Sequence, residues 1–98
     1  MPELSFRLRY QSLTGPRTVE VLPVKQLGRI RWQVLANDAR LDFAGTFFPA
    51  PRRAVEVVEE TLVKRYGEAA LLEWRITDRA GERAIERAEL AELLRRGQ

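Results

Sequence analysis

Two short stretches of this chain alternate arginine with large apolar residues, once near the N-terminus and once around residue 30. In a β-strand, successive side chains point to opposite faces, so each stretch would bury its apolar set and expose its guanidinium groups. If these strands share one sheet, the guanidinium groups share its outer face. Guanidinium groups bind phosphates well, so the pattern predicts contact with a nucleic-acid backbone. The arginines of this predicted face are Arg7, Arg9, Arg29, Arg31 and, from the next strand, Arg40.

Two other interpretations of these arginines stay open. Charged side chains on a sheet also discourage aggregation through strand edges, and Glu20 and Asp42 would neutralise part of the row. The chain holds fifteen arginines against two lysines, a ratio that genome base composition or a heat-adapted lineage would also produce. That ratio accounts for the number of arginines and leaves their placement unexplained.

Arg52 and Arg53 form a second cationic feature, in the first turn of a helix that Pro51 is suited to begin. The amino end of a helix favours anions, so two cations there are mildly unfavourable for the fold. Such a position predicts a site for phosphate or carboxylate. In the alternative interpretation, the two side chains contact Glu56 and Asp42 or extend into solvent.

The residues available for catalysis are few. The chain has no histidine and no cysteine, so the usual general base, the thiolate nucleophile and the commonest transition-metal ligands are missing. Asp38 and Asp42 could approach across a turn as an acid and base pair or as Mg²⁺ ligands. A turn residue at Asp38 and an arginine partner for Asp42 are the preferred interpretation. We therefore expect no enzyme, no metal and no cofactor.

Length and charge set further bounds. Ninety-eight residues suit one compact domain spanning residues 1–98. Residues 1–53 hold nine basic against four acidic side chains, whereas residues 54–98 hold eight against ten. A phosphate polymer or an acidic protein would therefore be attracted to the first half. The sequence lacks a signal-peptide pattern and any apolar run of membrane-spanning length, so we expect a cytoplasmic protein without a membrane partner.

Alternating apolar residues predict strands over residues 4–10, 18–24, 29–36 and 40–48. Pro23 cannot donate to a ladder, so the second strand is expected at an edge or with a bulge. In strict alternation Phe48 points to the basic side, where it could stack on a base or anchor a partner. A bend before Pro49 would instead place Phe48 under the following helix. The predicted surface for a protein partner or a second copy is Leu22, Val24, Leu27 and Phe48.

The second half predicts a helix from residue 51 to a stop at Gly67, and a strand over residues 71–77 with Leu72, Trp74 and Ile76 inward. A short return strand and a C-terminal helix follow. The predicted fold is α+β: an antiparallel sheet, made of a four-strand meander followed by an α-β-(β)-α segment, with both helices on one face.

The function expected from these observations is a small non-catalytic module that contacts the phosphates of DNA or RNA through an arginine-lined sheet face. The alternative is an accessory or regulatory protein that binds another protein or a second copy through an edge strand.

Overall fold

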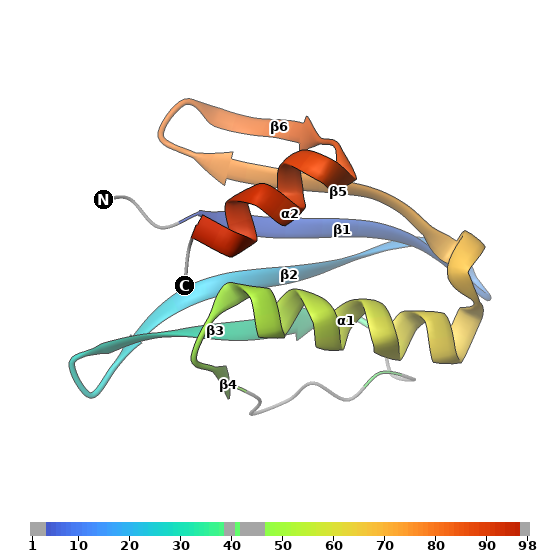
Figure 1. Cartoon of the computed structure of the whole chain (residues 1–98). Coiled ribbons are helices and arrows are strands. Elements are labelled where there is room, and N and C mark those ends of the chain that lie inside the picture. Colours follow the sequence, from blue (N-terminus) through green and yellow to red (C-terminus); the bar gives the residue numbers. More distant parts are fainter. Residues whose placement is uncertain (1–3, 39–40, 42–46, 97–98) are drawn as a thin grey trace.

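The computed structural model describes residues 4–38, 41 and 47–96. It confirms the α+β fold, with six antiparallel strands in the order β4-β3-β2-β1-β5-β6 and two helices on one face of the sheet (Figure 1). In chain order the elements are β1 (Ser5–Ser12), β2 (Gly15–Gln26), β3 (Arg29–Ala36), β4 (Phe47–Phe48), α1 (Pro51–Tyr66), the short 3₁₀ helix η1 (Glu68–Ala70), β5 (Leu71–Asp78), β6 (Gly81–Ile85) and α2 (Arg87–Arg96).

The strand β1 lies in the middle of the sheet because β5 pairs with its free edge instead of extending the meander. The alternation of apolar residues and arginines in β1 suits this central position. Phe6, Leu8 and Tyr10 are all buried, at 3%, 0% and 0% exposure, beneath the helices. The intervening arginines point to the uncovered face, which we call the outer face. The strand phase predicted from the alternation is therefore confirmed for β1.

The position of β2 differs from the prediction. It is not an edge strand: it pairs with β1 on one side and β3 on the other, and Pro23 lies in register with Trp32 without a bulge. However, β2 pairs with β1 only as far as Val21. Among the described residues, no strand flanks Leu22–Gln26 on that side, and a proline is tolerated where a strand lacks a neighbour. The β2–β3 hairpin therefore extends beyond the rest of the sheet (Figure 1).

The predicted fourth strand is represented by Phe47–Phe48 alone, since most of residues 40–48, Phe43 among them, lies outside the described residues. Strict alternation from residue 40 gives the wrong facing for the two phenylalanines. Phe48 pairs with Trp32, whose side chain faces the helices, so Phe48 is buried at 9% exposure and Phe47 takes the other face. Phe48 belongs to the core and is no exposed anchor for a partner, as in the alternative interpretation.

One residue of β5 also departs from the prediction. Strict alternation places Leu72 inward with Trp74 and Ile76, yet Leu72 is 48% exposed. The register between β1 and β5 shifts next to Tyr10, which pairs with Leu71. Such a bulge adds one residue to one strand and turns the side chain away from its expected face.

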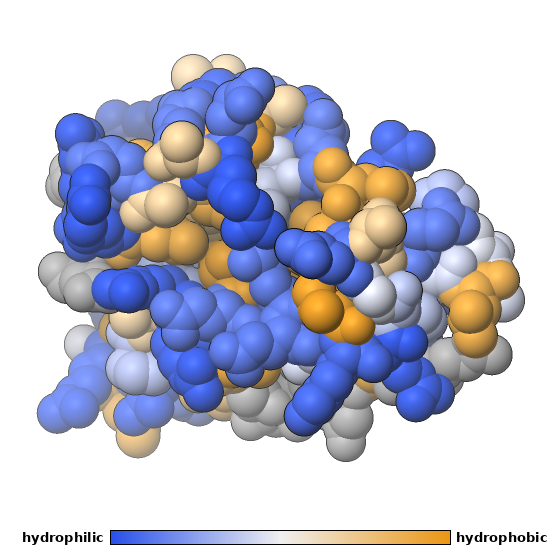
Figure 2. Space-filling model, turned by 45° about the vertical axis from the view of Figure 1, so that its right-hand side comes forward, coloured by the Kyte–Doolittle hydropathy of each residue, from blue (hydrophilic) through white to orange (hydrophobic). Residues whose placement is uncertain are grey.

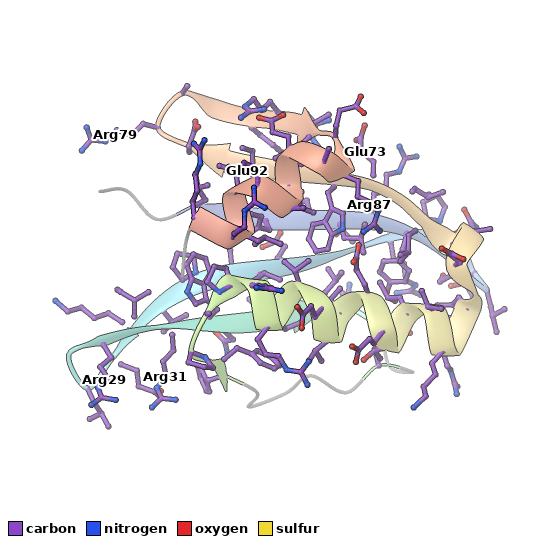
Figure 3. The ribbon with its side chains drawn as sticks, viewed as in Figure 1. Arg29, Arg31, Glu73, Arg79, Arg87 and Glu92 are labelled. Carbon is purple, nitrogen blue, oxygen red and sulfur yellow. The ribbon has the colours of Figure 1, made fainter. Side chains whose placement is uncertain are left out.

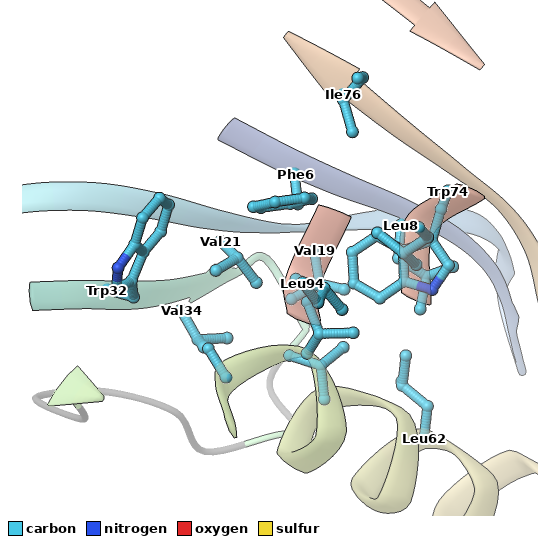
Figure 4. Close-up of a cluster of buried hydrophobic side chains, with 14 of the residues drawn as sticks. Phe6, Leu8, Val19, Val21, Trp32, Val34, Leu62, Trp74, Ile76 and Leu94 are labelled. Atoms are coloured by element: carbon cyan, nitrogen blue, oxygen red, sulfur yellow. The ribbon is translucent and has the colours of Figure 1, made fainter. Parts of the chain in front are cut away.

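The helix α1 begins and ends where the sequence predicts. Pro51 occupies its first turn, and Gly67 follows its last residue with a positive φ of 92° while its N–H donates to the carbonyl of Val63 at 2.9 Å. The face toward the sheet carries Ala54, Val58 and Leu62, each with no exposed area. These side chains join those of the strands in one core (Figure 4).

Glu59 connects α2 to the rest of the core. Its carboxylate accepts a hydrogen bond from the Trp74 indole N–H at 2.8 Å and from the Arg87 guanidinium at 2.7 Å. Leu90 and Leu94 of α2 are buried below this contact. One half-buried acid thus holds α1, α2 and β5 together.

No helix among the described residues is long and apolar enough to cross a membrane.

Candidate functional site

The outer face of the sheet carries a mixed network of charges around Arg7. Its guanidinium donates to Glu20 at 2.8 Å and to Glu82 at 3.4 Å. Arg75 lies opposite Arg7 on β5 and donates to Glu82 at 3.1 Å and to Glu73 at 3.2 Å. These hydrogen bonds, first of all the one to Glu73, raise the pKa of Arg75 above its usual value. The centre of the outer face is therefore close to neutral, unlike the continuous basic row predicted from the alternation.

The remaining predicted arginines are divided by their surroundings. Arg9 is exposed and lies in register with Glu73, at some distance along β1 from the hairpin. Arg29 and Arg31 lie together at the start of β3, near the tip of the β2–β3 hairpin (Figure 3). Neither of these two forms an ion pair with a described residue. Arg40 lies outside the described residues.

Arg52 and Arg53 both contact one acid. Glu56, one turn further along α1, accepts from Arg52 at 3.2 Å and from Arg53 at 3.3 Å. This is the arrangement of the alternative interpretation, with Glu56 taking the role of the anion. A ligand at the amino end of α1 would have to compete with this carboxylate.

Residues 22–31 of the β2–β3 hairpin hold three positive charges and no acid. We call residues 22–31 the arm. The interval between Glu20 and Asp38 contains no acid, and the only charged residues in this interval are Lys25, Arg29 and Arg31. These three equal the net charge of +3 of the whole chain. No described residue forms an ion pair with any of them, so the arm keeps its full charge toward solvent.

The tip of the arm is a two-residue turn with an unusual occupant. Leu27 and Gly28 both have positive φ, 52° and 78°, as a type I′ turn requires. Glycine, asparagine and aspartate usually fill these positions. Other residues are destabilised there by about 1 kcal/mol, because the Cβ atom lies too close to the following carbonyl oxygen. Leu27 is nevertheless present and 97% exposed. The leucine contributes little to the core and is unfavourable for the turn.

Apolar side chains accompany the cations on the outer face. The register places Leu22 beside Gln33 and Val24 beside Arg31, and both aliphatic side chains are partly buried. Leu35 continues this set at 45% exposure. The predicted partner residues Leu22, Val24 and Leu27 thus lie on the same arm as Arg29 and Arg31, whereas the sequence pattern predicts two separate surfaces.

Asp38 is fully engaged in the fold. Its Oδ2 atom accepts hydrogen bonds from the hydroxyl of Tyr10 at 2.9 Å and from that of Tyr66 at 2.7 Å, and the two rings stack at 5.9 Å. Burial, and next the hydrogen bond to Asp38, raises the pKa of Tyr10 far above its ordinary value. This supports the structural interpretation of Asp38, while Asp42 lies outside the described residues.

The helix side offers open grooves lined by charged and apolar side chains. One groove of about 810 Å³ lies beside Glu59, Lys64 and Arg87. Charged side chains cover much of this side, and apolar ones appear in separate patches (Figure 2). Every buried side-chain polar atom among the described residues has a hydrogen-bond partner. The grooves therefore present no buried polar group aimed at a ligand.

The alternation of arginines does not reveal Lys25, because the strand of Lys25 contains no alternating arginine. The long interval without acids between Glu20 and Asp38 is the signal that could have found it. The Tyr10 and Tyr66 hydroxyls were missed as well, since residues 28 and more positions apart meet only in the folded chain.

In comparisons with known proteins, no protein-family model, no curated protein and no solved structure matches this chain. The candidate site is therefore argued from its own geometry.

Proposed function

We propose that this protein is a small non-catalytic module that binds the phosphate backbone of nucleic acid through its β2–β3 arm. The observation that carries the proposal is the charge of the arm, which contains Lys25, Arg29 and Arg31, while no acid lies between Glu20 and Asp38. Such a cluster attracts the phosphates of a nucleic acid, because each contact releases counterions that are condensed on the nucleic-acid backbone. Arg7, Arg52 and Arg53 play a smaller part, since carboxylates already occupy them.

The limited number of cations implies weak binding with little sequence preference. Three phosphate contacts give a slope of about −2.7 in a plot of log affinity against log salt for B-DNA. Non-specific binding of this kind has dissociation constants of roughly 10⁻⁴ to 10⁻⁶ M at physiological salt. The module would therefore act as one contact among several in a larger assembly, or at high local concentration.

The test is a salt titration of binding to short DNA and RNA duplexes, followed by fluorescence anisotropy. The double variant Arg29→Glu and Arg31→Glu reverses two charges and breaks no ion pair of the described residues. It should lose all measurable binding at low salt and keep its melting temperature.

The matched control is Lys64→Glu with Arg65→Glu, at the far end of α1, which changes the net charge by the same amount. It should reduce binding far less, because its charges lie away from the arm. The proposal fails if the wild-type protein binds no nucleic acid at low salt, or if both double variants lose affinity equally.

A second candidate function rests on a different observation. The segment Leu22–Gln26 lacks a strand neighbour on its β1 side among the described residues, and Leu22, Val24 and Leu35 lie beside it. A free strand next to apolar side chains suits a protein partner or a second copy. Pro23 and Lys25 weaken backbone pairing there, as residues that protect strand edges do. Sedimentation at increasing concentration, with Val24→Ser as the variant, tests for a dimer.

A further inference from the structure

The presence of leucine at the tip of the arm needs a physical explanation. Leu27 is 97% exposed and has a φ of 52°, in a turn where asparagine or glycine would fit without strain. Its side chain therefore neither favours the turn nor fills the core. A conformation that is unfavourable for the fold is commonly found where a residue acts on something outside it.

The two faces of the arm are both positive. Lys25 lies in register with Ile30, whereas Arg31 lies in register with Val24 and Arg29 with Gln26. Since neighbouring residues of a strand point to opposite faces, Lys25 extends on the helix side and the two arginines extend on the outer face. The arm is thus a narrow ribbon with cations on both faces and one apolar side chain at its tip.

We propose that the tip of the arm enters the minor groove of duplex DNA, where Leu27 inserts between two base pairs and kinks the duplex. Lys25, Arg29 and Arg31 then contact phosphates of the two strands that border the groove. Apolar side chains inserted at the minor groove unstack base steps and bend DNA in this way. This inference rests on the proposed function and names its ligand and its mode of binding.

The length of the arm fits this task. Beyond the last pairing with β1, the six residues from Leu22 to Leu27 make five steps of about 3.4 Å, about 17 Å in all. The minor groove is about 7.5 Å deep and about 6 Å wide, so the turn at the tip can reach the base edges while the two strands and the body of the protein stay outside the backbone. Figure 1 shows the hairpin extending past the start of α1, free of both helices.

The aromatic residues favour a duplex over a single strand. Single-stranded nucleic acid is usually held by bases stacked on exposed aromatic rings. Here Phe6, Tyr10, Trp32 and Trp74 are all buried, and the exposed large apolar side chains among the described residues are aliphatic. An aliphatic wedge is suited to separating stacked base pairs and poorly suited to stacking on a free base.

The amount of apolar surface favours DNA over a membrane. Stable attachment to a bilayer takes two signals even when one of them is a whole acyl chain. One leucine at the tip is a much smaller anchor.

The experiment measures DNA bending by energy transfer between dyes at the two ends of a duplex of about 20 base pairs with a central TA step, which is easily kinked. A 2-aminopurine base beside that step reports unstacking. The wild-type protein should raise both signals, and a minor-groove-binding dye should abolish them.

Leu27→Asn removes the wedge and suits the turn. It should abolish the bending and unstacking signals, with a change in affinity below about threefold because the phosphate contacts remain. Leu27→Met keeps an apolar wedge and should retain both signals. The matched control is Leu13→Asn, which changes the other exposed hairpin leucine, at 73% exposure, and should have no effect.

Each outcome is decisive. Bending that depends on Leu27 and not on Leu13 supports the inference. Binding without bending, or equal bending by Leu27→Asn, overturns the inference and leaves the proposed function intact. No binding to any nucleic acid at low salt overturns both. Leu27-dependent binding to vesicles of anionic phospholipid, with no DNA bending, overturns the inference in favour of a membrane surface.

Discussion

Arg7 and Glu20 face each other across the β1–β2 ladder, with the guanidinium Nη2 atom 2.8 Å from the carboxylate Oε1 atom. This pair is the first link in a chain of contacts that continues through Glu82 and Arg75 to Glu73. The central outer face is balanced by this network, so the net positive charge of the protein is left on the arm.

Neutralising Glu20 should make the outer face of the sheet more positive, because Arg7 loses its nearest carboxylate. Glu20→Gln leaves Arg7 with Glu82 as a single, longer carboxylate contact at 3.4 Å, so Arg7 can contact phosphate more readily. Affinity for nucleic acid at low salt should rise, and the salt slope should steepen by up to about 1. Exposed ion pairs contribute little, so stability should fall by less than about 1 kcal/mol. Anisotropy titrations and urea unfolding measure the two effects. Glu60→Gln gives the same change in net charge at an acid without an ion pair among the described residues. An equal gain in affinity for both variants would contradict the prediction.

Removing the strained side chain from the arm should stabilise the fold. Leu27→Asn places a residue that tolerates the left-handed region at a φ of 52°, for a gain of about 1 kcal/mol. For a domain of this size such a gain raises the melting temperature by roughly 4–8 °C. Calorimetry checks the shift. A variant that melts below the wild type would show that Leu27 makes a contact in solution that supports the turn.

Stability should decrease at alkaline pH because of Tyr10. Burial and the hydrogen bond to Asp38 raise its pKa above the ordinary value of about 10, so the folded protein keeps this proton after the unfolded chain has lost it. The contribution is complete below about pH 10 and is lost above it, at about 1.4 kcal/mol per pH unit. Urea unfolding between about pH 8 and 12 measures this slope.

The variant Tyr10→Phe isolates that contribution. It should be less stable at neutral pH by about 1–3 kcal/mol, because the hydrogen bond of 2.9 Å to Asp38 is lost. Its alkaline slope should be shallower than that of the wild type. Identical slopes for the two proteins would assign the alkaline transition to other groups.

The attachment of α2 should depend on Glu59. Glu59→Gln weakens its contacts with Arg87 and Trp74, so amide hydrogen exchange in Arg87–Arg96 should accelerate while the central strands stay protected. The control is Glu92→Gln, whose partners Arg95 and Arg96 lie on the same helix. Equal acceleration in both variants would mean that α2 is held by its leucines alone.

Much of the local structure follows from short-range patterns. Alternation of period two set the facing of Phe6, Leu8 and Tyr10, and the limits of α1 followed from Pro51 and Gly67. These predictions succeed because backbone geometry and capping depend on neighbouring residues. Leu72 and Phe48 failed for the opposite reason: a bulge and a two-residue strand depend on the partner strand, which the local pattern does not contain.

The candidate site divides in the same way. The sequence by itself determined that Arg29 and Arg31 share one face of a strand and that no acid lies between Glu20 and Asp38. Only the tertiary structure decided which arginines remain available, because β5 pairs with β1 and brings Glu73 and Glu82 to the side of Arg7. Strand periodicity is a property of consecutive residues, whereas charge neutralisation depends on the order and register of strands far apart in the chain.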